Sequence, residues 1–397
     1  MSQRKRQDQD VCALILGGGL NGYSVARELH ENGVENIVLF AGRRDFVFHS
    51  NIYTTVRIVP PEIGVLHQAI KLLHDDYNFI VTYPISDVYV ESLYTLHRTI
   101  DDFCYIGFNP STIHDLFSKS QQYTFCKEHN IPHPKTKNLI DYMLSRERDL
   151  TYPLLVKPDV WDQNTRDKKT FKTLVLNTEE DLEAQNERLS ELMRQGINLL
   201  ITEIVPGDDD TIYGYVAYRS KTGKILSEWI WRKLSQYPEG YGVFSTISNQ
   251  GPDRVRELGR EVFEKMNLHG INEIEFKYDA RDDQFKYIET NFRSPMLIRL
   301  GRLTGVDVCY TQYLDATGVT PKKQVQIQDK NIHYVHFQSE LLNLIARPGY
   351  ITKFWRNIFS SDETYFSLFN PHDIMPMIYS IIELFQAAFQ KMKPKKP

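Results

Sequence analysis

The residues best suited to chemistry are carboxylate and amide side chains within positions 270–295. Two strand-like segments, 271–279 and 285–292, flank the five residues ARDDQ, which could form the loop of a hairpin. Strand alternation would then place every second side chain on the same face. The hairpin predicts three cross-strand pairs: Glu275 with Glu289, Glu273 with Asn291, and Asp279 with Phe285.

The facing Glu275 and Glu289 indicate a cation site. Two carboxylates directly opposite each other repel, and apolar surroundings strengthen that repulsion. A cation between them removes the repulsion, and the Asn291 amide completes an oxygen-only ligand set of the kind that Mg²⁺ prefers. The alternative is an exposed acidic hairpin whose charges are solvated.

Cations at the ends of two further strands could serve phosphate chemistry. Lys157 ends the apolar segment 152–158, from which its amine could reach a phosphate. The alternative is a solvated lysine at a strand end. Arg232 and Lys233 also end a strand-like segment, and cations there could neutralise charge on a transferred phosphoryl group.

The segment 199–207 is strand-like, stops at a Pro-Gly pair and is followed by three aspartates. Such a stop leaves unpaired backbone groups that could bind the edge of an adenine. A nearby carboxylate could accept hydrogen bonds from ribose hydroxyls. The alternative is an ordinary acidic turn.

In chain order these segments resemble the ATP-grasp superfamily over about residues 11–320. The matching features are the helix of Lys119 leading to IPHPKT at 131–136, the Lys157 strand, the hinge at 202–207, and YIETNFR at 287–293. The resemblance implies a mixed fold of α/β and α+β parts. A pre-ATP-grasp domain with a parallel sheet is expected first, followed by an ATP-grasp domain of two α+β subdomains.

The resemblance also implies a role for each matching residue. Lysines are expected to bind the ATP phosphates, a hinge to bind adenine, a carboxylate to bind ribose, and an oxygen-rich set to bind magnesium. The residues are Lys119 and Lys157 for phosphate, Glu203 and Val205 for adenine, Asp209 for ribose, Glu275, Glu289 and Asn291 for the metal, and Arg293 with Arg232 for the acyl phosphate.

Within this superfamily, LILGGGLNGYSVAR at 14–27 and RKLSQYP at 232–238 are similar to the D-aspartate ligase group of carboxylate–amine ligases. That similarity implies a ligase that uses ATP and Mg²⁺, with two ions expected and Mn²⁺ as a substitute. A carboxylate, such as that of an amino acid, would become an acyl phosphate and react with an amine. The acceptor could be a cell-wall or polysaccharide precursor, and a homodimer is expected.

The chain departs from the superfamily in the flap that follows the second lysine. Residues 159–173 contain no glycine, although this flap is usually rich in glycine. We expect side-chain cations to cover the phosphates instead. They are Arg166, Lys168, Lys169 and Lys172.

Two other functions fit parts of the sequence. GGGLNG at 17–22 follows a strand and partly imitates a dinucleotide-binding turn, and Arg43 with Arg44 could hold a 2′-phosphate. This would make the protein an NADP-dependent oxidoreductase, but it leaves the segment 287–293 without a role. The second alternative is a non-catalytic nucleotide-binding protein of envelope assembly.

Composition limits the class of protein. The chain has 397 residues, and its 47 basic and 51 acidic residues give a formal charge of −4, which offers no general attraction to nucleic acid. The four cysteines are far apart, so we expect a reduced, cytoplasmic protein without disulfides or structural zinc.

The sequence predicts three parts. Alternating strands and helices in 1–110 indicate a parallel sheet, and 111–325 forms the ATP-grasp domain, with lobes at 111–205 and 206–325. A helical extension is expected at 326–397. Its last helix, followed by Lys391, Lys393, Lys395 and Lys396, either lies on an anionic membrane or docks on the core.

Overall fold

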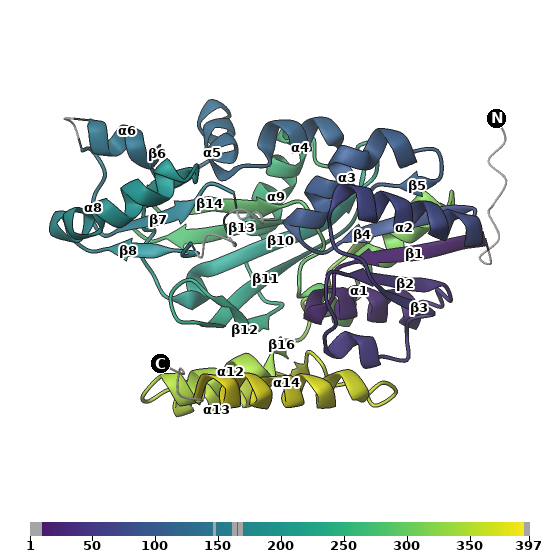
Figure 1. Ribbon diagram of the computed structural model, residues 1–397. Coiled ribbons are helices and arrows are strands. Elements are labelled where there is room, and N and C mark those ends of the chain that lie inside the picture. The colour runs from purple at the N-terminus through teal and green to yellow at the C-terminus, as the bar shows by residue number, and fades with distance from the viewer. Residues whose placement is uncertain (1–9, 146–147, 161–164, 166–169, 393–397) are drawn as a thin grey trace.

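The computed structural model of the chain describes residues 10–145, 148–160, 165 and 170–392, with side chains as far as Gln386. Figure 1 shows a parallel sheet beside two largely antiparallel sheets, and a layer of C-terminal helices along one edge of the molecule. Each sheet provides one part of the site described below.

The N-terminal part is a five-stranded parallel sheet in the order β3-β2-β1-β4-β5. Its central strands are apolar along their whole length and buried on both faces, as a parallel sheet covered by helices requires. The elements are β1 (Val11–Leu16), α1 (Gly19–Glu31), β2 (Ile37–Ala41), the short η2 (Phe46–His49), β3 (Thr55–Ile58), α2 (Ile63–Asp76), β4 (Phe79–Pro84), α3 (Asp87–Ile100) and β5 (Cys104–Tyr105).

The turn between β1 and α1 needs its glycines. Gly17 and Gly19 adopt φ angles of +117° and +68°, which side chains with a Cβ rarely adopt. A Cβ on Gly22 would lie 2.4 Å from the carbonyl oxygen of Gly17, so the helix starts closely packed against the strand end.

The expected first lobe, residues 111–205, contains a four-stranded antiparallel sheet in the order β6-β9-β7-β8. Its core is formed by apolar residues of the sheet and of the helices packed on it. The elements are α4 (Pro110–Leu116), α5 (Lys119–Glu128), β6 (Thr136–Asn138), α6 (Leu139–Leu144), β7 (Leu154–Pro158), β8 (Leu174–Leu176), α8 (Glu179–Arg194) and β9 (Leu199–Glu203).

The second lobe is built on an eight-stranded sheet in the order β14-β13-β10-β11-β12-β16-β17, with β15 paired to β11. The elements up to residue 325 are η3 (Asp209–Thr211), β10 (Ile212–Arg219), β11 (Ile225–Tyr237), β12 (Val243–Ser248), α9 (Asp253–Lys265), β13 (Gly270–Asp279), β14 (Gln284–Asn291), α10 (Ile298–Leu303), α11 (Val308–Ala316) and β15 (Gln324–Val325).

The two faces of this sheet bury different cores. Tyr215 and Phe276 belong to the core that contains α9, whereas Trp229 and Trp231 of β11 belong to the core that contains α11 and, from the N-terminal part, α1. Because both cores continue into the N-terminal sheet, the second lobe and the N-terminal part share their apolar interior. The four cysteines are free and buried.

The segment after residue 325 contributes strands as well as the expected helices. β16 (Ile332–Val335) pairs with β12, and β17 (Glu363–Phe366) continues the sheet. Three helices complete the segment: α12 (Phe337–Ala346), α13 (Ile351–Phe359) and α14 (Met375–Met392). No helix in the described part of the chain is long and apolar enough to cross a membrane.

Candidate active site

The hairpin β13–β14 brings the predicted carboxylates together. Glu275 pairs with Glu289 and Glu273 pairs with Asn291, so these two predictions are confirmed. The predicted pair of Asp279 with Phe285 is wrong, because the register shifts between Glu275 and Phe276 and Asp279 pairs with Gln284 instead. The extra residue in β14 is Ile288, and it forms a bulge directly beside Glu289.

The carboxylates differ in their surroundings. Glu273 is almost fully buried, and its Oε2 accepts a hydrogen bond from Asn291 Nδ2 at 3.0 Å. Its Oε1 is buried and has no hydrogen-bond partner among the described residues. Burial, with the charge of Glu275 beside it, raises the pKa of the Glu273 carboxyl to about 8.

The pKa values of the other two carboxylates, Glu275 and Glu289, shift in opposite directions. Burial raises the pKa of Glu275, with Glu289 adding to this and Lys233 opposing it. Burial also acts on Glu289, but the nearby ammonium groups of Lys119, Lys157 and other cations outweigh it and lower the Glu289 pKa. Facing carboxylates whose pKa values shift in opposite directions are typical of functional sites in which nearby charges perturb titration.

Lysines reach this cluster from three elements. Lys119, at the start of α5, places Nζ 3.8 Å from Oε2 of Glu289. Lys233 of β11 places Nζ 4.0 Å from Oε2 of Glu275. Lys157 of β7 is buried, and the charges of both glutamates oppose the lowering of its pKa by burial. The two predicted phosphate lysines are therefore on the same side as the predicted metal ligands.

Tyr123 fixes Lys157 against the hairpin. The Lys157 ammonium donates to the Tyr123 hydroxyl at 2.8 Å, and that hydroxyl donates to the carbonyl oxygen of the bulge residue Ile288 at 2.8 Å. Tyr123 lies one helical turn after Lys119, so α5 supplies both a cation and the group that orients a second cation.

Arg293 lies next to the metal-ligand candidates and is tied to the N-terminal part. Its Nε donates to Asp87 Oδ1 at 2.9 Å, and its terminal nitrogen donates to Asn291 Oδ1 at 3.3 Å. Asp87 starts α3, so the candidate site includes the edge of the parallel sheet.

Arg232 does not reach the cluster, which corrects its predicted position. Arg232 of β11 pairs with Tyr213 of β10, and its guanidinium lies 5.7 Å from the centre of that ring. Both side chains lie on the face of the sheet opposite the carboxylates. There Arg232 donates to the carbonyl and carboxylate oxygens of Asp210 at 2.6 and 3.0 Å. Successive side chains of a strand point to opposite faces, so Lys233 faces the cluster.

The hinge residues lie where β9 ends. The Glu203 amide donates to Lys135 O at 2.9 Å, and its carboxylate accepts from the Thr151 amide at 3.0 Å. The Val205 side chain is buried. Because the Glu203 amide already has a partner, an adenine would have to bind backbone groups beyond it.

Asp209, the predicted ribose ligand, is held by two later elements. Its Oδ1 accepts from Gln236 Nε2 at 2.7 Å, and its Oδ2 lies 3.8 Å from Lys353 Nζ of α13. Lys277 of β13 is close enough for the Asp209 charge to act on its pKa. The predicted ribose ligand Asp209 therefore adjoins the C-terminal segment.

Of the flap cations, only Lys172 can be placed. Its charge opposes the raised pKa of Glu275 and adds to the lowering of the Glu289 pKa. Arg166, Lys168 and Lys169 lie outside the described residues. Lys172 thus supports the expectation that side-chain cations reach the cluster from this segment.

Sequence reasoning named Glu273 only as the cross-strand partner of Asn291 and Lys233 only as a cation at a strand end. It missed Tyr123 beside Lys157 and Lys353 beside Asp209. Glu273 and Lys233 follow from strand parity, and Tyr123 follows from its spacing to Lys119. For Lys353 no local signal exists, because α13 approaches Asp209 only through the tertiary fold.

A cation fits the cluster chemically. Glu275, Glu289 and Asn291 offer oxygen atoms, and the unpartnered Oε1 of Glu273 lies buried behind them. Among the described residues, no three His, Cys, Asp or Glu side chains are close enough to hold a metal by themselves. Carboxylate and amide oxygens are the ligands that suit Mg²⁺, which takes few protein ligands and completes its shell with water and phosphate.

The carboxylate of Asp45 occupies the glycine-rich turn between β1 and α1. Asp45 Oδ2 accepts a hydrogen bond from the Gly19 amide at 2.8 Å. A Cβ on Gly18 would lie 2.2 Å from the same oxygen. The carboxylate occupies the place where a dinucleotide phosphate would bind the helix N-terminus, which argues against the NADP alternative.

No family model matches the chain. A curated relative, D-aspartate ligase of Enterococcus faecium (strain Aus0004), is 21% identical over 306 residues, covering 72% of each chain.

Solved structures resemble the fold. An N5-carboxyaminoimidazole ribonucleotide synthetase in complex with ADP superposes with a TM-score of 0.63 and 12% identity, covering 85% of both chains. The biotin carboxylase domain dimer of the Hydrogenobacter thermophilus 2-oxoglutarate carboxylase, with MgADP and bicarbonate, has a TM-score of 0.61 and 14% identity, covering 79% of this chain and 71% of the other. The chain therefore has the ATP-grasp fold predicted from its motifs, and its sequence is similar to that of a D-aspartate ligase.

Proposed function

We propose that the protein is an ATP-dependent carboxylate–amine ligase that forms an amide or peptide bond. The observation that carries this proposal is the facing pair of Glu275 and Glu289, approached by lysines from α5, β7 and β11. A cluster of this kind combines a hard-cation site with several phosphate-binding cations. The similarity to a D-aspartate ligase supports the reaction class.

The metal would be held by Glu275, Glu289 and Asn291. When bound, Mg²⁺ neutralises phosphate charge and holds the phosphates in line for transfer. Two ions, and Mn²⁺ as a substitute, stay predictions from the family resemblance. One neighbour was solved with MgADP, which supports the choice of nucleotide and metal.

The reaction would have two steps. A substrate carboxylate oxygen attacks the γ-phosphorus of ATP, the bond to the bridging oxygen of ADP breaks, and an acyl phosphate forms. An amine nitrogen then attacks the acyl carbon, the carbon–oxygen bond to phosphate breaks, and the nitrogen loses a proton. The products are an amide, ADP and inorganic phosphate.

The chain's own residues would bind and orient the reactants. Lys119 and Lys157 would bind the phosphates, with Lys157 held by Tyr123. Arg293, fixed by Asp87, would hold the carboxylate or acyl phosphate at the edge of the N-terminal sheet. A preorganised arginine costs little reorganisation when charge develops.

We propose an amino acid as the carboxylate substrate, with aspartate tested first because of the similarity to D-aspartate ligase. The amine acceptor would be a cell-wall or polysaccharide precursor. A homodimer stays a prediction.

The test is phosphate release from ATP and Mg²⁺, measured with single amino acids and amine acceptors in a matrix. Release that needs both a carboxylate and an amine supports the proposal, with the amide confirmed by mass spectrometry. Glu289→Ala should abolish it, whereas Asp282→Asn, in the loop of the same hairpin, should not. ATP binding without turnover for any pair would favour the non-catalytic alternative, and tight NADPH binding would favour the oxidoreductase.

A further inference from the structure

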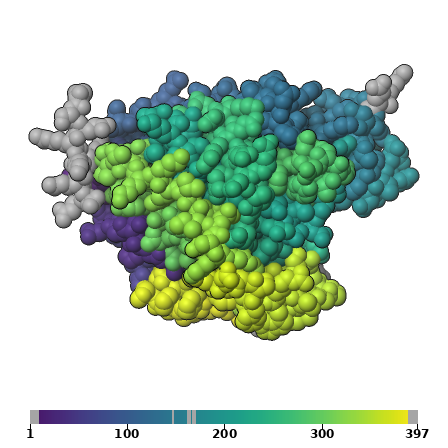
Figure 2. Space-filling model, turned by 180° about the vertical axis from the view of Figure 1, so that it is seen from behind, coloured from purple at the N-terminus to yellow at the C-terminus, as the bar shows by residue number. Residues whose placement is uncertain are grey.

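The C-terminal segment concentrates exposed apolar side chains. Of the 22 large apolar side chains that the described residues expose, 11 lie within 337–385. Figures 1 and 2 show this segment as a layer along one edge of the molecule. An exposed concentration of this kind marks a surface that meets another apolar phase or partner.

The exposed apolar side chains of α13 form one stripe. Ile351, Trp355 and Phe359 are spaced by four residues, so they lie on one face of the helix. Trp355 is 51% exposed and Phe359 is 71% exposed, and their rings stack with centroids 5.5 Å apart. The face beneath packs inward through Phe354.

A second stripe runs along α14. Met375, Ile378, Ile382 and Phe385 are exposed at helical spacing. Glu383 lies to the side of this stripe, close enough to Asp45 and Arg43 of the N-terminal part for their charges to act on its pKa. The stripe itself is therefore uncharged.

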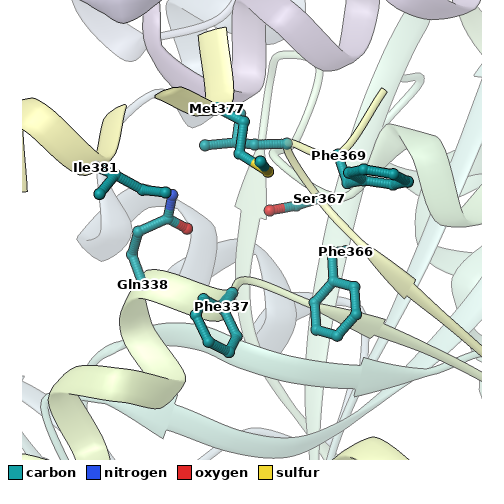
Figure 3. Close-up of a pocket in the computed structure, with 8 residues that line it drawn as sticks. Phe337, Gln338, Phe366, Ser367, Phe369, Met377 and Ile381 are labelled. Atoms are coloured by element: carbon teal, nitrogen blue, oxygen red, sulfur yellow. The ribbon is translucent and has the colours of Figure 1, made fainter. Parts of the chain in front are cut away.

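A groove separates α12 from α14 and is also apolar. It encloses about 230 Å³ and is lined mainly by aromatic and aliphatic side chains (Figure 3). The lining includes Phe337, Phe366, Phe369, Met377 and Ile381. An open groove of this composition suits hydrocarbon such as an acyl chain.

The charges around the stripes indicate what covers them. Beyond Glu383 the sequence has no acidic residue but four lysines, at 391, 393, 395 and 396. Two acidic residues of the layer are bound within the chain, since Glu363 pairs with Lys330 and Asp362 accepts from the Asn331 amide. The sequence is therefore basic where α14 ends, and anionic headgroups complement that charge.

We propose that this layer docks the protein on an anionic membrane surface. The stripes of α13 and α14 would enter the boundary between headgroups and acyl chains, and the positive charge of the lysines at and beyond the end of α14 would add attraction to anionic headgroups. Aromatic and aliphatic side chains on one face with basic residues beside them are the pattern of interfacial helices.

The experiment is co-sedimentation of the full chain with vesicles of phosphatidylcholine, alone or with about 30% phosphatidylglycerol. We expect binding about tenfold tighter to the anionic vesicles, weakened by salt. Replacing the last three lysines together by glutamine should remove this preference. Tryptophan emission should shift to the blue on binding, and Trp355→Phe should abolish that shift while preserving sedimentation.

The double variant Trp355→Ala/Phe359→Ala should bind about tenfold more weakly, whereas Leu144→Ala, at a still more exposed apolar residue on α6, should bind like the wild type. Unchanged thermal unfolding would show that both variants fold. Absence of binding by the wild type would overturn the proposal. So would a dimer in sedimentation velocity that the double variant abolishes, because a second copy would then cover the face.

Discussion

Buried carboxylates occur in two regions of this chain and are stabilised in different ways. Glu340 of α12 is fully buried, yet both of its oxygens are satisfied by the chain. Its Oε1 accepts from Ser235, Thr246 and Asn357 at 2.6–3.0 Å, and its Oε2 accepts from Tyr350 at 2.9 Å. These bonds join the C-terminal segment to β11 and β12.

The carboxylates of the β13–β14 hairpin lack such a set of hydrogen bonds. Glu275 and Glu289 face each other, and their nearest lysine nitrogens lie 4.0 and 3.8 Å away, beyond hydrogen-bond distance. The bonds to both oxygens of Glu340 indicate a structural role, whereas we expect the less satisfied carboxylates of the hairpin to bind a ligand.

Glu28 is a third buried carboxylate, and only one of its two oxygens accepts hydrogen bonds from the described residues. Its Oε1 accepts from the Cys309 and Tyr310 amides at 2.6 and 3.0 Å, at the N-terminus of α11. Its Oε2 is buried without a hydrogen-bond partner among the described residues. Burial raises the pKa of Glu28 to about 8, as it does for Glu273. A raised pKa alone therefore does not identify the site; the surrounding cations do.

The strongest test of this contrast is Glu275→Gln. Removing a metal ligand should lower phosphate release by about a thousandfold. It also removes a repelling charge, so the free energy of unfolding without nucleotide should rise by about 1 kcal/mol. Turnover assays and urea denaturation measure the two effects. Loss of both activity and stability would mean that the cluster is structural.

The converse variant is Glu340→Ala. It leaves several buried donors without an acceptor, so the free energy of unfolding should fall by about 3 kcal/mol. Urea denaturation measures this loss. Phosphate release per folded molecule should stay within about twofold of the wild type. A variant of unchanged stability but lost turnover would contradict the structural role of Glu340.

Glu28 should make stability depend on pH. Its pKa is about 8 in the folded chain and near the ordinary 4.5 when unfolded, so the folded state binds more protons between those values. The contribution of Glu28 to stability is complete below about pH 4.5 and is lost as pH rises through 8, by up to about 1.4 kcal/mol per pH unit.

The measurement is urea denaturation of wild type and Glu28→Gln at pH 5 and pH 8. The wild type should lose more stability than the variant over this interval. Equal losses in both proteins would mean that Glu28 does not carry the proton.

The smallest predicted change in activity distinguishes Lys233 from its neighbour Arg232 on β11. Lys233→Ala should lower phosphate release about tenfold and raise KM for ATP, because Lys233 faces the cluster. Arg232→Ala should change both constants by less than about threefold, since Arg232 binds Asp210 on the other face. Steady-state kinetics decides between them. A larger effect at Arg232 would mean that the register is wrong or the lobe rearranges.

Much of the site could be predicted because it is local in sequence. The alternation of side chains along β13 and β14, together with the short loop between them, is enough to place Glu275 opposite Glu289. The end of the same hairpin was mispredicted, because the bulge at Ile288 is set by its contact with Tyr123 of another lobe. Arg232 was misplaced because β11 continues past it to Tyr237, and its side chain lies on the face opposite the carboxylates.

The sequence by itself determined the parallel N-terminal sheet, the glycine-rich turn and the acidic hairpin. Apolar periodicity, positive φ angles and strand alternation act between near neighbours, so local sequence encodes them. Only the tertiary structure decided that Lys119, Lys157 and Lys233 converge on this hairpin, that Asp45 fills the turn, and that α13 reaches Asp209. These contacts join residues that are distant in the chain, and they form only when apolar burial packs the sheets together.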